Sequence, residues 1–114
     1  MNDDELAHTI ATLRADYAKQ LPATVTQMED LWRRIVSGES PLSRLAELAR
    51  MAHSITGAGA TFGLPGASSA ARELELFLEQ IGDSGQLPGA AEQARVAAQF
   101  AELRLAASQQ TPGI

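Results

Sequence analysis

The most informative stretch of the chain is Arg50-Met51-Ala52-His53-Ser54-Ile55-Thr56-Gly57-Ala58-Gly59-Ala60-Thr61-Phe62-Gly63. Apolar or small side chains recur in it at helical spacing and continue a stripe from the preceding residues. The stripe consists of Leu42, Leu45, Leu48, Ala52, Ile55, Gly59 and Phe62. His53 lies one position off this stripe, so we expect its imidazole to project beside the buried seam. Small residues lie one turn before and one turn after it, at Ala49 and Gly57, and leave a shallow surface through which another protein can reach His53.

Two glycines within a single helical turn need a physical reason. Each Gly costs about 1 kcal/mol relative to Ala inside a helix. Gly57 and Gly59 could permit the close approach of a partner's backbone, or Gly59, which lies on the stripe, could permit close packing of a neighbouring helix. The sequence leaves both explanations open.

Length and composition indicate one small helical domain. The chain has 114 residues, of which 45% are hydrophobic, 20% charged and only 4% aromatic. We expect a single domain over residues 1–114 with an ordered core of about 4–107. The scarcity of aromatic residues and the abundance of Ala favour closely packed helices over a β-sandwich.

Charge and cysteine content exclude several classes of partner and site. The net charge of −5 argues against a sequence-independent grip on nucleic acid or on an anionic membrane. No cysteine is present, which excludes disulfides and thiolate metal sites. The uncharged run of residues 51–71 contains His53, four glycines and Pro65, so we do not expect a membrane span. The acidic N-terminus lacks the features of a secretory signal, and we expect a cytoplasmic protein.

The first third of the chain carries one long apolar stripe whose phase survives a proline. Its members are Leu6, Ile10, Leu13, Tyr17, Leu21, Val25, Met28, Trp32 and Ile35. Pro22 removes one helical hydrogen bond and usually kinks a helix. Because the phase persists, we predict one long kinked helix or two nearly collinear helices whose stripe faces one core.

Three further helices are predicted after Gly38. Ser40 as N-cap and Pro41 at the first helical position predict a helix over residues 41–61. Residues 64–66 should then form a tight turn, and the helix that follows carries a stripe from Leu64 to Ile81 and should be followed by a turn at residues 82–85. The last should begin near Pro88 and present Ala97, Phe100, Leu103 and Ala107 to the core. Short connections between these helices predict an all-α fold, an antiparallel up-down four-helix bundle with an N-terminal helix extension and no strand.

Three segments together resemble a known family, the histidine-containing phosphotransfer (HPt) domains. The segments are residues 52–57 (Ala-His-Ser-Ile-Thr-Gly), residues 60–63 (Ala-Thr-Phe-Gly) and residues 71–75 (Ala-Arg-Glu-Leu-Glu). The resemblance covers nearly the whole chain, from about Leu6 to about Ala107. Many members of this family carry Lys three residues after the histidine, where this chain has Thr56.

The resemblance implies a phosphorelay intermediate. His53 would accept a phosphoryl group from the aspartyl phosphate of a receiver domain and pass it to another receiver. The chain would then be a phosphoryl carrier and not an enzyme in the usual sense. It would hold no metal or cofactor itself, since Mg²⁺ is expected on the receiver. The partners would be receiver domains of response regulators or hybrid histidine kinases, and we expect a monomer.

Several residues near His53 are candidates for holding phosphate or for docking a partner. Arg50 and Thr56, three residues before and after His53, share its part of the helix surface. Arg72 on the next helix is a third candidate phosphate neighbour. The expected docking face consists of Ala49, Gly57 and Ala60.

The second histidine, His8, and the acidic N-terminal run have simpler explanations, and two other functions remain as alternatives. His8 is expected to be an ordinary surface residue, and the acidic run of residues 3–5 is expected to be helix-end charge and not a metal site. The alternatives are a helical adaptor that docks a receiver without transferring phosphate, and the phosphorylated domain of a chemotaxis-type histidine kinase. Thr56 favours the adaptor, whereas the absence of the Lys and of a kinase domain argues against the chemotaxis-type domain.

Overall fold

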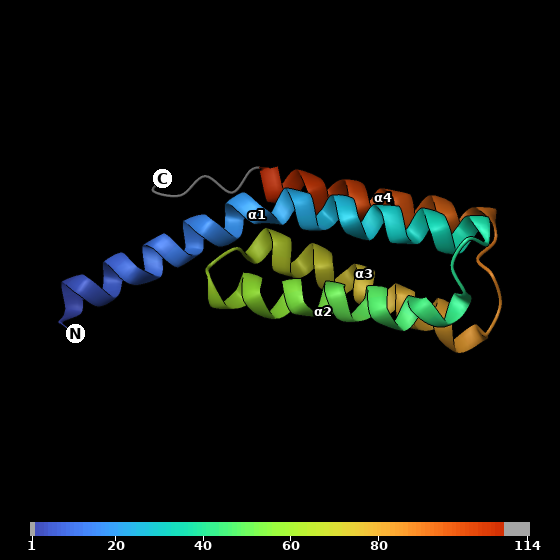
Figure 1. The fold of residues 1–114 in the computed structure, drawn as a ribbon, viewed down its shortest axis with the longest axis horizontal. Coiled ribbons are helices and arrows are strands. Elements are labelled where there is room, and N and C mark those ends of the chain that lie inside the picture. The colour runs from blue at the N-terminus through green and yellow to red at the C-terminus, as the bar shows by residue number, and fades with distance from the viewer. Residues whose placement is uncertain (1, 109–114) are drawn as a thin grey trace.

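The computed structural model describes residues 2–108, and these form four α-helices and one 3-10 helix without a strand. The helices are α1 (Asp3–Ser37), η1 (Leu42–Arg44), α2 (Leu45–Thr61), α3 (Pro65–Ser84) and α4 (Ala90–Ser108). In Figure 1 α1 and α4 lie side by side above the pair α2 and α3, and consecutive helices run in opposite directions. The predicted all-α up-down bundle is therefore confirmed.

α1 is one continuous helix of 35 residues with Pro22 inside it. Its first turn is stabilised by Asn2, whose Oδ1 accepts a hydrogen bond from the backbone N–H of Glu5 at 2.8 Å. Three acidic residues in that turn also stabilise the helix, because their negative charge lies at the positive end of the helix dipole. The prediction that the helical phase persists across Pro22 is confirmed.

α1 is about twice as long as any helix that could cover it. At 1.5 Å per residue it spans about 52 Å, and the whole molecule measures 53 × 23 × 20 Å. Its first part, residues 3–16, projects from the bundle and is called the N-terminal arm below (Figure 1). Leu6, Ile10 and Leu13 on the arm are 41–49% exposed. The expectation that the whole stripe faces the core is wrong for these three residues, because α2 and α3 end before reaching them.

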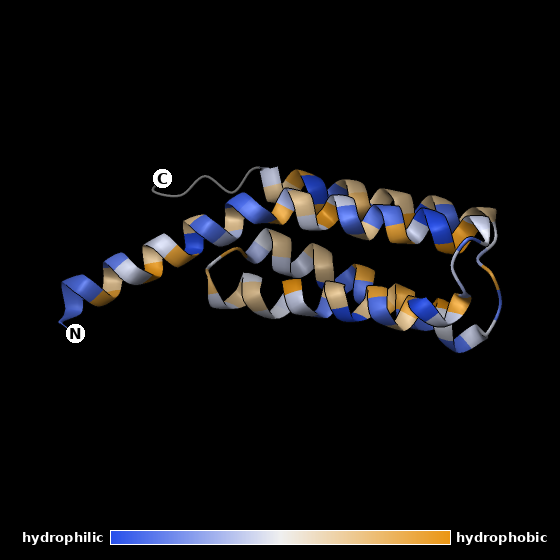
Figure 2. Ribbon diagram, in the orientation of Figure 1, coloured by the Kyte–Doolittle hydropathy of each residue, from blue (hydrophilic) through white to orange (hydrophobic). Residues whose placement is uncertain are grey.

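The core lies between the four helices where they overlap. In Figure 2 hydrophobic residues recur along the α1, α2, α3 and α4 ribbons. Its largest fully buried side chains are Leu21, Val25, Met28, Ile35, Leu48, Leu74, Leu78, Ile81, Val96 and Leu103. On α4 the predicted Phe100, Leu103 and Ala107 are buried, but Ala97 is exposed and Val96 occupies the core instead. Ala97 lies one residue off the true stripe, which begins at Val96.

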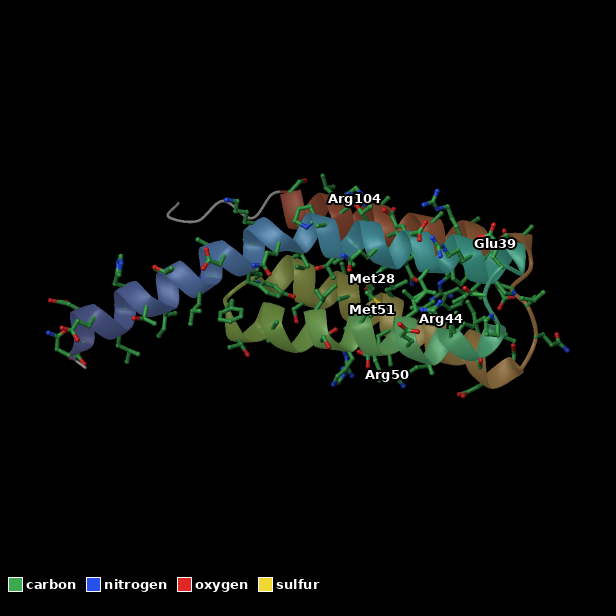
Figure 3. The ribbon with its side chains drawn as sticks, in the orientation of Figure 1. Met28, Glu39, Arg44, Arg50, Met51 and Arg104 are labelled. Carbon is green, nitrogen blue, oxygen red and sulfur yellow. The ribbon has the colours of Figure 1, made fainter. Side chains whose placement is uncertain are left out.

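The connection between α1 and α2 differs from the prediction. Gly38 ends α1 in the left-handed conformation with φ of 85°. Ser40 does not cap a helix: its Oγ accepts a hydrogen bond from Arg44 at 3.3 Å, and Arg44 also binds Glu47 through two hydrogen bonds. Arg44 is labelled at this end of the bundle in Figure 3. The Arg44 hydrogen bonds lower the pKa of Glu47, and the regular helix begins at Leu45 instead of residue 41.

α3 and α4 also have shifted ends. The prediction of a turn at residues 64–66 is wrong, because α3 already begins at Pro65. At its other end α3 continues to Ser84, through most of the turn predicted there, and Gly85 follows as its C-cap with φ of 69°. α4 begins at Ala90, two residues after the predicted Pro88.

α2 and α3 pack against each other very closely at Gly59. A Cβ placed there would lie 3.0 Å from the Cβ and the backbone N of Ser68. Ser68 also donates a hydrogen bond from its hydroxyl to the Thr56 carbonyl at 2.7 Å. Gly59 thus serves helix packing, whereas a Cβ at Gly57 would meet nothing within 4 Å.

Candidate functional site

The site is centred on His53, which projects from α2 into solvent. Its side chain is 72% exposed. Its neighbours Ala52 and Ile55 are buried and fix this part of α2 against the core. Figure 3 shows Arg50, one turn earlier, on the outward side of the same helix. A histidine on a rigid helix is therefore presented to an incoming partner.

The carboxyl group of Glu75 on α3 lies against the imidazole ring of His53 and fixes its orientation. Its Oε2 lies 2.8 Å from Nδ1 of His53. A carboxylate can only accept hydrogen bonds, so Nδ1 is the nitrogen that carries the proton. The lone pair is then on Nε2, the nitrogen on the far side of the ring. The pair thus presents a nucleophilic nitrogen to the outside.

Glu75 occupies an unusual place for a carboxyl group. Its side chain is only 10% exposed, and it lies between the buried Leu74 and Phe77 along α3. Its second oxygen, Oε1, is buried and has no hydrogen-bond partner among residues 2–108. A buried polar atom without a partner costs free energy. Because the contact with His53 is the hydrogen bond that the carboxyl group does make, the two residues form one unit.

A shallow hollow surrounds this pair on one side. Its volume is about 340 Å³, and it opens widely to solvent. It is lined by Ala46, Ala49, Arg50, His53, Glu75 and Glu79. The hollow therefore brings one cation and two carboxyl groups to the edge of the imidazole.

The three candidate phosphate neighbours have different positions. Arg50 is exposed and lines the hollow beside His53. Thr56 is half-buried, and its hydroxyl donates to the Ala52 carbonyl at 3.1 Å. Arg72 is exposed on α3 and does not line the hollow. The structure thus brings Arg50 to the site, whereas the Thr56 proton is already used by the helix backbone.

The expected docking face is only partly accessible. Gly57 and Ala60 are exposed on α2, on the side of His53 towards the helix end. Ala49 is 8% exposed, so the expectation that it is accessible is wrong. Ala49 borders the buried stripe of α2 and packs towards α3. The surface that a partner can touch therefore lies mainly on the C-terminal side of His53, with Arg50 on the other side.

Glu75 is a candidate site residue that the sequence interpretation did not single out. It belongs to the Arg-Glu-Leu-Glu segment of residues 72–75, and it sits next to Leu74, four positions after Ala71 and three before Leu78. A carboxyl group on the apolar side of a helix is rare without a partner, and this was the available signal. Among residues 2–108, no cluster of three or more His, Asp or Glu side chains is arranged to hold a metal ion.

Comparison with known proteins gives one family. The family model described as Hpt domain matches residues 12–110. Comparisons with curated proteins and with solved structures gave no match. None of the helices within residues 2–108 combines the length and the hydropathy that crossing a membrane requires.

Proposed function

The chain belongs to the Hpt domain family, a family of phosphocarrier signalling domains that interact with receiver domains, and we propose that His53 is its phosphoryl-accepting residue. In this proposal His53 takes the group from the aspartyl phosphate of one receiver and returns it to the Asp of another. The chain acts as a carrier between them.

The observation that carries the proposal is the geometry of the His53–Glu75 pair. The ring is 72% exposed, and its inner nitrogen is held 2.8 Å from a buried carboxyl oxygen. A carrier histidine needs one nitrogen to be free for attack and a fixed ring orientation. Both needs are met by this arrangement, whereas a surface histidine without a role needs neither.

The transfer step balances without a group from outside the two proteins. The Nε2 lone pair attacks phosphorus, and the bond between phosphorus and the Asp carboxyl oxygen breaks with its electron pair going to that carboxylate. The imidazole acquires positive charge as the new N–P bond forms. Glu75 offsets that charge through the Nδ1 proton, as a carboxylate behind a histidine does in other catalytic sites. The reverse step passes the group to the Asp of the second receiver.

Other groups have supporting roles in the proposal. Arg50 is the side chain of this chain best placed to contact phosphate oxygens. Gly57 and Ala60 leave room for the receiver's surface above α2. Mg²⁺ belongs to the receiver, where it neutralises charge on the transferring group. The cytoplasmic location expected from the sequence is also part of the proposal.

The proposal is tested by mixing the chain with receivers carrying labelled aspartyl phosphate. Label should move to the chain in a form that is lost in acid and kept in base, the stability expected of a phosphoramidate. Adding a second, unphosphorylated receiver should remove it again. A chain that binds receivers but never takes up label would instead be the docking adaptor.

A further inference from the structure

A pocket of about 670 Å³ lies between α1 and α4, which Figure 1 shows side by side and apart from the helix pair that carries His53 and Glu75. Pockets that hold small organic ligands have volumes of about 300–1,000 Å³. None of its lining residues borders the hollow beside His53. It is called the α1–α4 pocket below, and its lining includes Glu29, Trp32, Arg33, Val36, Ala97 and Phe100.

The walls of the α1–α4 pocket are apolar over much of their extent. Trp32 and Phe100 are 7% and 2% exposed, and Val36 is half-buried. Ala97 on α4 is exposed and ends in a single methyl group, so no long side chain from that position fills the space beside Trp32. A ligand in the pocket would therefore bury an apolar body against these four residues.

The indole N–H of Trp32 is a hydrogen-bond donor that opens into this pocket. It has no hydrogen-bond partner within residues 2–108, and it is not among the unpartnered atoms that are sealed inside the core. Because Trp32 is 7% exposed and lines the α1–α4 pocket, the accessible N–H faces the pocket. A buried tryptophan usually donates its N–H to an acceptor, and an acceptor atom of a ligand in the pocket can fill this place.

Arg33 brings positive charge and free donors to the same pocket. A guanidinium has five N–H donors, and within residues 2–108 Arg33 uses one of them, in a hydrogen bond of 3.0 Å to Asp30. Asp30 is shared with Arg34, whose Nε lies 2.9 Å from its other carboxyl oxygen. The carboxyl group in the pocket, Glu29, is already paired with Arg104. These two networks hold three arginines and two carboxyl groups, so they carry one net positive charge in a chain whose net charge is −5.

We propose that the α1–α4 pocket binds a small carboxylate with an apolar body. The carboxylate accepts hydrogen bonds from the Trp32 N–H and from Arg33, and the body packs against Val36, Ala97 and Phe100. Hydrogen bonds between a guanidinium and an ionised acceptor are about twice as strong as those between neutral groups. A cationic ligand is disfavoured, because Glu29 is neutralised by Arg104 and the ligand would meet the charge of Arg33.

The test follows Trp32, the single tryptophan of the chain, while phenylacetate is added to the whole protein. We expect a saturable change in tryptophan fluorescence and a shift of the indole N–H resonance in NMR spectra. A ligand of this size should bind with a Kd of roughly 0.1–1 mM. The uncharged analogue phenylacetamide should bind about tenfold more weakly or less. No saturable change at phenylacetate concentrations well above that range, or equal binding of the acid and the amide, would overturn the proposal.

Arg33 and Arg34 give a matched pair of variants for the charged end of the site. Both arginines bind Asp30, but only Arg33 lines the α1–α4 pocket. Arg33→Gln should weaken phenylacetate binding roughly tenfold, whereas Arg34→Gln should bind it as wild type does. Equal affinities of the two variants would show that Arg33 does not hold the carboxylate.

Ala97 and Ala94 give a matched pair for the apolar end. Both are exposed on α4, and only Ala97 lines the pocket. Ala97→Leu should abolish binding because its side chain fills the pocket, whereas Ala94→Leu should leave binding unchanged. Both variants should keep the fold, since leucine is a good helix former at an exposed position, and circular dichroism checks this. Binding by a folded Ala97→Leu chain at the wild-type affinity would place the ligand elsewhere. Neither pair depends on the proposed phosphotransfer, because no receiver takes part in the measurement.

Discussion

The carboxyl group of Glu75 determines which ring nitrogen of His53 faces solvent. Glu75→Gln keeps the size of the side chain and removes its charge. We expect the rate of phosphotransfer to fall about 10- to 100-fold, the range found when metal-binding histidines lose a carboxylate partner. The thermal midpoint should change little or rise, because the substitution removes a buried charge.

The matched control is Glu79→Gln, one turn further along α3. Glu79 lines the same hollow but is exposed and makes no hydrogen bond to His53 within residues 2–108. The Glu79→Gln chain should accept phosphate at nearly the wild-type rate. Nitrogen NMR of the imidazole should show the Nδ1 proton fixed in wild type and in Glu79→Gln and mixed tautomers in Glu75→Gln. Equal rates for the two variants would show that Glu75 has no part in the chemistry.

Gly57 and Gly59 offer a second test at single residues. Gly57→Leu should raise the free energy of unfolding by roughly 0.5–1 kcal/mol, since its Cβ meets nothing and Leu favours helix. Its transfer rate should nevertheless fall roughly tenfold or more, because a partner is held away from His53. Gly59→Leu should destabilise by about 1–3 kcal/mol or more through overpacking against Ser68. Urea unfolding and transfer kinetics measure both effects, and an unimpaired Gly57→Leu chain would place the docking face elsewhere.

At this scale the sequence predicted the position of His53 but not its surroundings. A residue that lies one position off an apolar stripe is predicted to be exposed, and this prediction holds for His53 and Gly57. It failed for Ala49 because a small residue at the edge of a stripe is buried or exposed according to how closely the neighbouring helix approaches. Ala49 lies beside Leu78 and Gly82 of α3, and no single-helix pattern contains this neighbourhood of two helices.

Among the elements, α1 shows that packing can override the tendency of proline to break a helix. Pro22 lies inside the helix and cannot donate to the Ala18 carbonyl. Pro22→Ala should therefore stabilise the chain by about 1–3 kcal/mol, less than the full cost of a mid-helix proline because proline also restricts the unfolded chain. Equilibrium unfolding in urea measures this change in the free energy of unfolding, provided that the dependence of that free energy on urea concentration is the same in both chains. A destabilised variant would show that the bundle needs the bend that Pro22 introduces.

The connection before α2 was predicted less well than the helices. A Ser followed by Pro is a common helix start, and a single sequence does not show that Arg44 competes for the Ser40 hydroxyl. The same limit applies to Ala97, where an Ala-rich helix offers two stripes one position apart. Large residues such as Val96 decide between such stripes, and packing against α1 and α3 selects the one that contains it.

For the whole molecule, the difference between the arm and the bundle should be visible in backbone dynamics. Within the arm only Arg14 is partly buried, beside Gly63, and the other residues are exposed, whereas Val25 and Met28 on the same helix are fully buried. In dilute solution hydrogen exchange should be fast over residues 3–16 and slower by orders of magnitude over residues 21–35. Uniform protection along α1 would show that the arm is packed even in the monomer. The sequence showed the stripe but not its exposure, because that depends on where α2 and α3 end.

The claim that most needs testing is that His53 alone carries the phosphoryl group. His53→Gln keeps a side chain of similar length whose amide can still donate to Glu75, so the fold should survive while the nucleophilic nitrogen is gone. His8→Gln, on the exposed arm, is the matched control. After incubation with a phosphorylated receiver, wild type and His8→Gln should carry acid-labile, base-stable phosphate, and His53→Gln should carry none. Acid-labile phosphate on His53→Gln would contradict the assignment of His53 as the acceptor.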